Sequence, residues 1–416
     1  MAHYSMLDER TQEELSGWLR LALEPGLGRA TGRQLLGALG LPHHALAAGP
    51  AALARHLPSD LAGRLAAPPQ ADVQAGIERA LHLLAQPGHC LITLADPHYP
   101  RSLFDSPDPP LMLFVRGDPQ WLRRPAVAIV GARNATGGGC DNARAFARYL
   151  AGKGWAVVSG LARGIDAAAH EGALLAGPDG GGTIAVLPGG LDSIYPPSHA
   201  QLAEQIAAHG ALVTEYPPGT PAQPFRFPDR NRLVAALARG VLVVEAAAQS
   251  GSLITARLAL ECGREVFAIP GSIHAPLARG CHALIRQGAK LVEQGSDIEE
   301  ELLRTGPTPP APSADRATTS EIDVPGWLAA REDTGTASPA APAARRPANR
   351  MLKDPTVLRV LDALGYEPAG ADQLCRRSGL EFSRVATVLT ELEMNDIVQR
   401  LDDGRYLRRQ QGIIYG

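Results

Sequence analysis

Two loops of the sequence combine glycines with arginines in the manner of phosphate-binding loops. The first loop, VGARNATGGGC, follows an apolar run at 126–130. Its glycines allow the backbone to approach a ligand, and a helix beginning after them would offer the partial positive charge of its N-terminus. Arg133 adds a guanidinium that can donate to two phosphate oxygens. We interpret this loop as an anion site with Arg133 as a ligand.

The second loop, SGLARGIDAAAH, follows the next apolar run directly. The hydroxyl of Ser159, the backbone amides of Gly160 and Gly164, and the guanidinium of Arg163 can converge on a second phosphate. We therefore predict that Ser159, Gly160 and Arg163 bind the same ligand as Arg133.

Asp166 and His170 lie four residues apart in the helix expected after this loop, so they would share one helical face. Such proximity suits a general acid–base pair, but it also suits a hydrogen bond that only orients the two side chains. The orienting role is the commoner of the two. We expect Asp166 also to cap the helix.

The stretch PFRFPDRNRLVAALA, from 224 to 238, concentrates arginines and phenylalanines. Guanidinium groups bind phosphates and aromatic faces stack on unpaired bases, so the combination is typical of single-strand binding without sequence preference. We expect Phe227 to stack on a base, Arg230 to bind phosphate, and Asn231 to contact a base edge or fix the loop. The arginines and phenylalanines of the stretch are Phe225, Arg226, Phe227, Arg230 and Arg232.

A further group of small polar residues, Ser250, Gly251, Ser252 and Thr255, opens a helix after the apolar run at 241–245. Such a helix start favours an anion, but the hydroxyls could equally cap the helix, and both interpretations stay open. Four anion-binding loops at one edge of a sheet suit a polyanion better than a single small ligand.

The motifs of common nucleotide enzymes are absent from the sequence. The Gly-x-Gly-x-x-Gly spacing is missing, and the run at 155–159 ends in Ser159 instead of an acidic residue that would bind a ribose. Neither a P-loop nor a Gly-x-Ser-x-Gly or His-Glu-x-x-His motif occurs, and no carboxylates have metal-ligand spacing. We therefore predict a binding protein without catalytic residues, cofactor or metal.

Composition places limits on the kind of protein. With 416 residues, 45 % of them hydrophobic, the chain exceeds what one core usually holds, so we expect several domains. A formal net charge of -3 means that any nucleic-acid site must be local. Five scattered cysteines without a Cys-x-x-Cys pair indicate a reducing compartment, and the chain shows neither a secretory pattern nor a membrane-spanning run. We expect a cytoplasmic protein without membrane insertion.

Apolar runs alternate with helical patterns between residues 89 and 304. This alternation predicts an α/β fold with a doubly wound, mostly parallel sheet, whose ligands bind at the carboxyl ends of the strands. The runs lie at 126–130, 155–159, 183–187, 211–214, 241–245, 265–269 and 289–292.

Three further parts flank this core. Residues 1–88 predict a small helical domain, residues 305–350 a disordered linker rich in Pro and Ala, and residues 351–416 a winged-helix domain. The last part carries nine basic and ten acidic residues, so DNA and a protein partner are equally compatible with it. In the helical domain, the Gly-x-Gly turn at 25–40 could offer amides to a phosphate, but a tight interhelical turn is favoured.

Several blocks, taken in order, resemble the signature of the DprA/Smf family: VAIVGARNAT, VVSGLARGIDAAAH, TIAVLPGGLDSIYPPSH, VTEYPPGTPAQPFRFPDRNRLVAALA and VLVVEAAAQSGSLITARLALECGREVFAIPG. The resemblance covers about residues 90–300 and departs from the family at Cys281, where Asn is more common. It implies a Rossmann-like core, an N-terminal helical domain of the SAM or helix-hairpin-helix type, and a C-terminal winged helix.

The resemblance also implies a function. Members of the family bind single-stranded DNA as homodimers, protect incoming DNA and help to load RecA during natural transformation and recombination, with single-strand-binding protein as a further partner. The family's DNA contacts fall at matching positions on Arg133, Ser159, Gly160, Arg163, Phe227, Arg230 and Asn231.

Two alternatives remain. A nucleotide-processing enzyme of the phosphoribohydrolase type shares the Rossmann-like core and a Pro-Gly-Gly turn, present here as LPGGLDS, but its pattern continues to a Glu that this chain lacks. A winged-helix regulator would bind duplex DNA through a basic recognition helix, whereas SRVATVLTELEM contains only Arg384 as a basic residue.

Overall fold

The computed structural model describes residues 9–304 and 354–408 of the chain, apart from 367, 396 and 402. These residues form two compact units, and the second one follows the segment 305–353. The predicted linker at 305–350 lies outside the described residues, and the predicted domain boundaries stay predictions.

The larger unit is built on a nine-stranded sheet with the strand order β1-β2-β6-β5-β4-β3-β7-β8-β9. The strands from β6 to β9 in this order are parallel, whereas β1 and β2 add an antiparallel edge. The doubly wound, mostly parallel sheet predicted from the sequence is therefore confirmed. The strands are β1 (His89–Thr93), β2 (Met112–Gly117), β3 (Ala126–Val130), β4 (Ala156–Ser159), β5 (Thr183–Val186), β6 (Gly210–Thr214), β7 (Gly240–Val243), β8 (Glu265–Ala268) and β9 (Lys290–Leu291).

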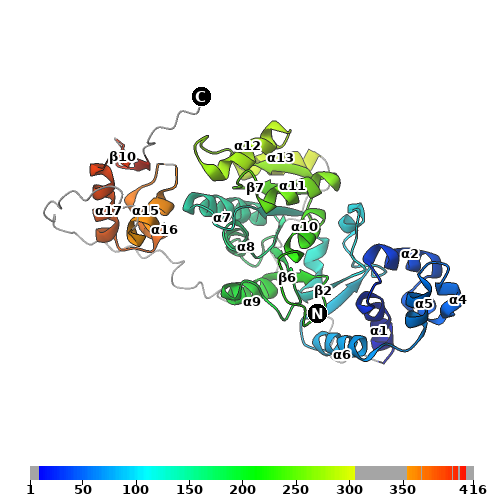
Figure 1. The fold of residues 1–416 in the computed structure, drawn as a ribbon. Helices are drawn as coiled ribbons and strands as arrows, with labels where there is room; N and C mark the ends of the chain where they lie inside the picture. Colours follow the sequence, from blue (N-terminus) through cyan, green and yellow to red (C-terminus); the bar gives the residue numbers. More distant parts are fainter. Residues whose placement is uncertain (1–8, 305–353, 367, 396, 402, 409–416) are drawn as a thin grey trace. The chain divides into compact units, whose positions relative to one another are not determined.

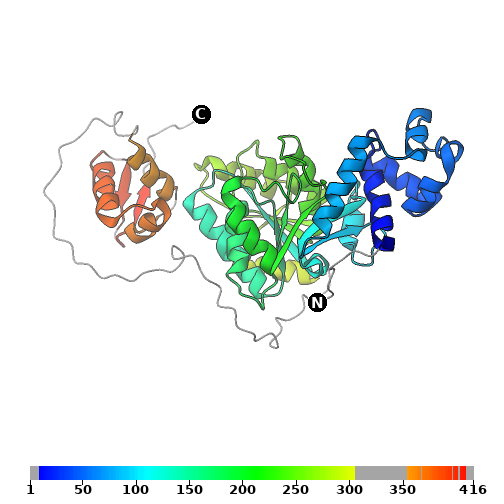
Figure 2. The same cartoon turned by 90° about the horizontal axis from the view of Figure 1, so that it is seen from below.

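Helices cover both faces of this sheet (Figures 1 and 2). Alternate residues of β3 enter two different cores: Ala128 packs with residues of α10 and α11, and Ile129 packs with residues of α7, α8 and α13. The strand is buried along its whole length, which explains its unbroken apolar sequence. The helices are α7 (Gly137–Gly152), α8 (Ile165–Leu174), α9 (Ala200–His209), α10 (Arg226–Leu237), α11 (Gly251–Glu261), α12 (Arg279–Arg286) and α13 (Gly295–Arg304).

Six helices precede the sheet, and the first and the last of them share its core. Trp18 and Ile77 pack in one hydrophobic cluster with Phe114 of β2 and Leu212 of β6. These two helices therefore contribute to the same buried apolar surface as the sheet edge that they adjoin, whereas buried residues of the other four, such as Leu35 and Leu61, form a separate cluster. These helices are α1 (Glu9–Leu23), α2 (Arg29–Leu39), α3 (Pro42–Ala47), α4 (Gly49–Leu53), α5 (Ser59–Ala66) and α6 (Ala71–Leu84).

The smaller unit has the element order of a winged helix. Helices α15 (Pro355–Leu364), α16 (Ala371–Ser378) and α17 (Phe382–Met394) precede an antiparallel hairpin of β10 (Val398–Arg400) and β11 (Tyr406–Arg408). The helices pack around a core of their own, which includes Val360, Leu374 and Leu389. This unit confirms the winged helix expected from the sequence.

Within the described residues, no helix is both long and apolar enough to cross a membrane, and no cluster of three His, Cys, Asp or Glu side chains could hold a metal ion.

The shared core predicts that α1 and α6 unfold together with the sheet. Trp18 is 1 % exposed, so Trp18→Ala should lower the free energy of unfolding of the larger unit by about 3–5 kcal/mol. Urea denaturation followed by circular dichroism would show one cooperative transition for this unit, moved to lower urea. Trp18→Phe is the control, because it retains most of the packing and removes an indole N–H that is buried without a partner among the described residues. A separate early transition for the helices would contradict the shared core.

Candidate functional site

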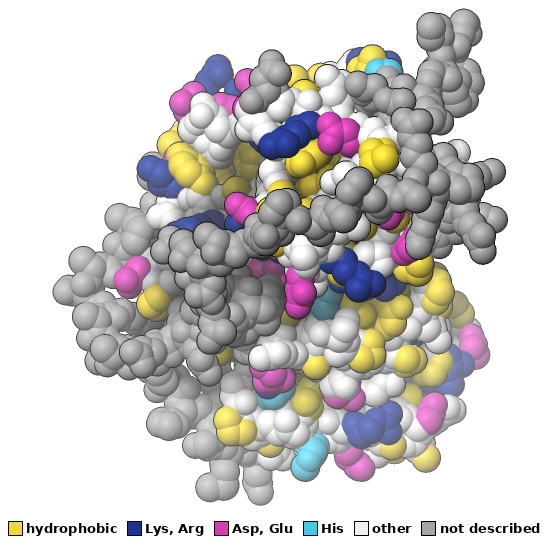
Figure 3. Space-filling model, turned by 90° about the vertical axis from the view of Figure 1, so that its left-hand side faces the viewer, with side chains coloured by type: hydrophobic (Ala, Val, Ile, Leu, Met, Phe, Trp, Pro, Cys, Tyr) yellow, Lys and Arg dark blue, Asp and Glu magenta, His cyan; other side chains and the backbone are white. Residues whose placement is uncertain are grey.

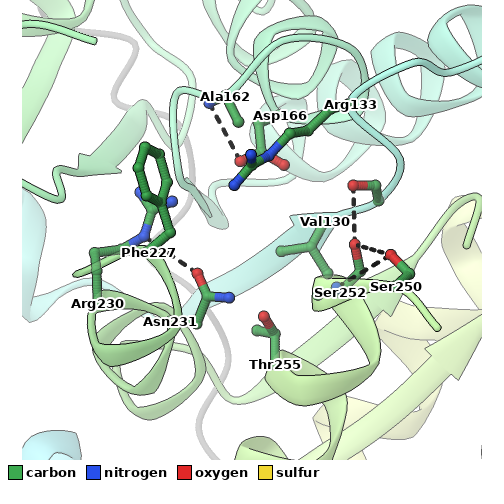
Figure 4. Close-up of a pocket in the computed structure, with 12 residues that line it drawn as sticks. Val130, Arg133, Ala162, Asp166, Phe227, Arg230, Asn231, Ser250, Ser252 and Thr255 are labelled. Carbon is green, nitrogen blue, oxygen red and sulfur yellow. Dashed lines mark hydrogen bonds between the residues drawn. The ribbon is translucent and has the colours of Figure 1, made fainter. Parts of the chain in front are cut away.

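A pocket of about 390 Å³ opens where the winding of the sheet reverses, beyond the carboxyl ends of β3, β4 and β7. In doubly wound folds this point leaves a crevice between the loops, because the connections of β3 and β7 run in opposite directions. Figure 4 shows loops from these strands and the first turns of α10 and α11 around the pocket. Its lining residues are Val130, Gly131, Arg133, Ala162, Asp166, Phe227, Arg230, Asn231, Ser250, Gly251, Ser252 and Thr255.

Arg230 joins α10 to the ends of two strands. Its side chain is 3 % exposed, and its Nη1 donates to the carbonyl of Gly160 at 2.6 Å and to the carbonyl of Val186. Burial lowers the pKa of Arg230 to about 10, so the guanidinium remains charged at neutral pH. The predicted phosphate ligand therefore forms part of the pocket wall, where most of its hydrogen bonds serve the fold.

Asp166 holds the loop after β4. Its Oδ2 accepts hydrogen bonds from the amides of Gly160 and Ala162, at 3.1 and 3.3 Å. Burial raises the pKa of Asp166, and the charge of Arg230 and these amides oppose that effect. The expectation that Asp166 caps the following helix is wrong, since Asp166 lies inside α8 and binds amides of the loop before it.

Asp166 and His170 do not act as a pair. The Nδ1 of His170 lies 2.7 Å from Oγ1 of Thr183, and that hydroxyl donates to the carbonyl of Val157. His170 must therefore donate from Nδ1, which leaves Nε2 unprotonated. Burial lowers the pKa of His170 to about 3, with the charge of Arg230 adding to the effect. The predicted orienting bond between Asp166 and His170 is replaced by separate bonds from each residue.

Phe227 forms the aromatic side of the pocket. The guanidinium of Arg133 lies over its ring, 4.8 Å from the ring centroid, and Tyr195 contacts it edge to face at 5.6 Å. Asn231 accepts from Nε of Arg230 at 3.2 Å, and its amide nitrogen points away from Arg230, towards the space before Thr255 (Figure 4). An aromatic face, a cation and an amide donor thus occur together.

Of the two roles that the sequence left open for the small polar residues at the start of α11, the structure shows the helix cap. Ser250 caps the helix, because its hydroxyl accepts from the amide of Ser252, and Ser252 donates to the carbonyl of Gly131 at 2.8 Å. The same residues line the pocket beside Thr255.

The seven residues predicted to bind the ligand fall into three groups in the structure: those that line the pocket, those that are buried and one that is exposed outside it. Four of them line the pocket together: Arg133, Phe227, Arg230 and Asn231. Ser159 and Gly160 are buried beneath the loop, with the Ser159 hydroxyl donating to the carbonyl of Ile129 at 2.6 Å. This environment fits a structural role for Ser159 better than a direct phosphate contact. Arg163 is exposed but is not among the residues that line the pocket.

The other two arginines of α10 are engaged by side chains of the protein. Arg232 is 8 % exposed and pairs with Glu215, so it does not supply the phosphate contact that the arginine-rich sequence suggested. Arg226 stacks on Tyr216 and on Phe225, with centroid distances of 5.2 Å. Tyr195, in contrast, was not predicted, because only the folded loop brings it to Phe227.

Charge at the surface is mixed. On the face shown in Figure 3, the coloured Lys and Arg side chains lie singly or in small groups among acidic and apolar ones. On this face no extended basic patch is seen among the described residues, so a local concentration of donors, as in the pocket, is the feature that favours an anion.

Two family models match the chain. DNA recombination-mediator protein A matches residues 90–303, and the DprA winged helix domain matches residues 337–404. Protein Smf of Escherichia coli is 47 % identical over 227 residues, which span 54 % of this chain and 60 % of that protein. Protein Smf of Synechocystis is 38 % identical over 327 residues, or 76 % of this chain and 80 % of that protein. The crystal structure of DNA processing protein A from Streptococcus pneumoniae superposes with a TM-score of 0.56 at 34 % identity, over 68 % of this chain and 97 % of that one.

The contact between Gly160 and Arg230 predicts a steric test of the pocket wall. A Cβ at Gly160 would lie 2.4 Å from the Arg230 guanidinium, which is buried and cannot move without losing its carbonyl partners. Gly160→Ala should therefore lower the free energy of unfolding by about 1–3 kcal/mol. Gly251→Ala is the matched control, because a Cβ there meets no described atom within 4 Å beyond its chain neighbours. Equal stability of the two variants in urea would show that Arg230 is free to move.

Proposed function

Since the chain belongs to the DNA recombination-mediator protein A family, we propose that its pocket binds single-stranded DNA without sequence preference. The arrangement of Arg133 over Phe227 is the observation that carries the proposal. A guanidinium provides a phosphate contact, and an aromatic ring within reach of it stacks on a base of the same strand. Asn231 adds an amide donor for a base edge or a phosphate oxygen.

A single strand fits this pocket better than a duplex. Stacking on Phe227 requires an unpaired base, because a base within a duplex is covered on both faces. The backbone contacts read no sequence, so affinity should depend on salt through the release of counterions.

The ionisable groups of the site favour binding over catalysis. The carboxylate of Asp166 is engaged by loop amides, and His170 is buried with its pKa lowered to about 3, so neither is poised to move a proton at neutral pH. We therefore propose a DNA-binding protein that needs neither a cofactor nor a phosphoribohydrolase activity.

The family supports a wider role as part of the proposal. We infer that a homodimer of the chain protects incoming single-stranded DNA in the cytoplasm and helps to load RecA on it. Single-strand-binding protein would cover the DNA before this step. A DNA site made mainly of backbone and stacking contacts suits such a handover, because it accepts any sequence.

The proposal predicts how two pocket variants bind labelled poly-dT in a fluorescence-anisotropy salt series. Arg133→Ala should weaken binding at every sequence and reduce the salt slope by about 0.7 for one lost phosphate contact. Phe227→Ala should cost about 1–3 kcal/mol of binding with an unchanged slope. Arg55→Ala removes an exposed arginine from the turn between α4 and α5 and should bind like the wild type.

Two further measurements complete the test: binding of a duplex of the same length, and incubation of the protein with AMP. Equal or stronger binding of the duplex would favour the winged-helix regulator, and release of adenine from AMP would favour the enzyme. Full binding by both pocket variants would show that the strand lies elsewhere on the protein.

A further inference from the structure

Arg29, at the start of α2, reaches from the N-terminal helices to the first turn of α10. Its Nη2 and Nη1 donate to the two carboxylate oxygens of Asp229, at 3.0 and 3.1 Å. The same guanidinium donates to Glu215 at 2.9 Å and to Asp108 at 2.8 Å. One side chain thus joins three carboxylates, and one of them belongs to the helix that carries Phe227 and Arg230.

This contact is held tightly from both sides. The pKa of Asp229 is lowered, although partial burial acts in the opposite direction. Hydrogen bonds from Arg29 and from the Tyr216 hydroxyl, which lies 2.7 Å from the carboxylate, outweigh the effect of burial. Arg232 adds a charge 3.6 Å from the same carboxylate. A guanidinium that grips both oxygens of a carboxylate fixes its orientation as well as its distance.

The first turn of α10 depends on such support. Its N-cap residue is Phe225, whose side chain has no polar group to accept from the first backbone amides and is 66 % exposed. Asp229 is the acidic residue of this turn, and it lies between Phe227 and Arg230 in the sequence. Whatever sets the position of Asp229 therefore also sets the position of the aromatic side of the pocket.

We propose that Arg29 is a positioning residue for single-strand binding, which holds the first turn of α10 so that Phe227 faces the pocket. The inference rests on the proposed function of the pocket and adds a role for the N-terminal helices in it. Arg29 touches no ligand in this scheme, since its donors are committed to carboxylates. The Gly-x-Gly turn then serves to place Arg29 at the first position of α2, directly after the N-cap residue Gly28.

Arg29→Ala should weaken poly-dT binding roughly 5- to 30-fold, which lies in the lower part of the roughly 5- to 150-fold range typical of coupling between two sites. The salt slope should stay unchanged, because no phosphate contact is lost. In a Phe227→Ala background the same substitution should change the affinity at most about twofold, because the residue that it positions is already gone. Asp229→Asn, which keeps the shape of the side chain and removes its charge, should reproduce the loss.

Arg33→Ala is the matched control. Arg33 lies one turn further along α2 and donates to Asp108 at 2.7 Å and to the carbonyl of Pro109, both in the connection before β2. Removing Arg33 weakens the docking of α2 and leaves both bonds between Arg29 and Asp229 in place, so the affinity of this variant for poly-dT should equal that of the wild type. Circular dichroism at the assay temperature would confirm that each variant is folded.

Each outcome separates this inference from the proposed function. If the wild type fails to bind poly-dT, the proposed function is wrong. If the wild type binds and Arg29→Ala binds as tightly as Arg33→Ala, the positioning role is wrong. A salt slope reduced by about 0.7 in Arg29→Ala would mean a direct phosphate contact and would overturn it as well.

Discussion

The guanidinium of Arg230 is the contact on which the pocket depends. It extends from α10 to carbonyls at the ends of β4 and β5, at Gly160 and Val186. Burying an ion is costly unless its hydrogen bonds are made. If either loop moved its carbonyl away, the buried guanidinium would lose a hydrogen bond that it cannot replace. The loops after two strands are thereby held against one helix, and that helix is the one that presents Phe227.

Glycine at position 160 is a consequence of this arrangement. A side chain there would occupy the volume of the guanidinium, so the sequence of the loop after β4 is fixed by a residue of α10 that follows 70 positions later. Asp166 closes the same loop from the other side by accepting from its amides. Glycine is therefore needed at position 160 because it has no side chain, and contacts on both sides hold the loop in one position.

Sequence patterns predicted the parallel strands and the switch point, because buried parallel strands are continuous apolar runs and ligands of this fold bind at their carboxyl ends. They missed β1 and β2, whose antiparallel pairing lies outside the alternation of strand and helix. They also assigned Arg230 to phosphate and did not reveal that its guanidinium binds two carbonyls of the pocket wall. Residue type could not decide this point, since a guanidinium suits a phosphate, a carbonyl and a carboxylate alike. The contact of Arg29 with Asp229, 200 positions away, left no local signal.

The arginines near the pocket divide into two groups according to their partners. Arg29, Arg230 and Arg232 are bound by carboxylates or carbonyls and determine the shape of the site. Arg133 instead lies over the Phe227 ring, a weaker partner that a phosphate can replace. In the proposed function, a chain with a net charge of -3 can attract a polyanion locally, because carboxylates and carbonyls engage the structural arginines and Arg133 remains available to the ligand. The same division explains why a count of basic residues gave little indication of where the site would lie.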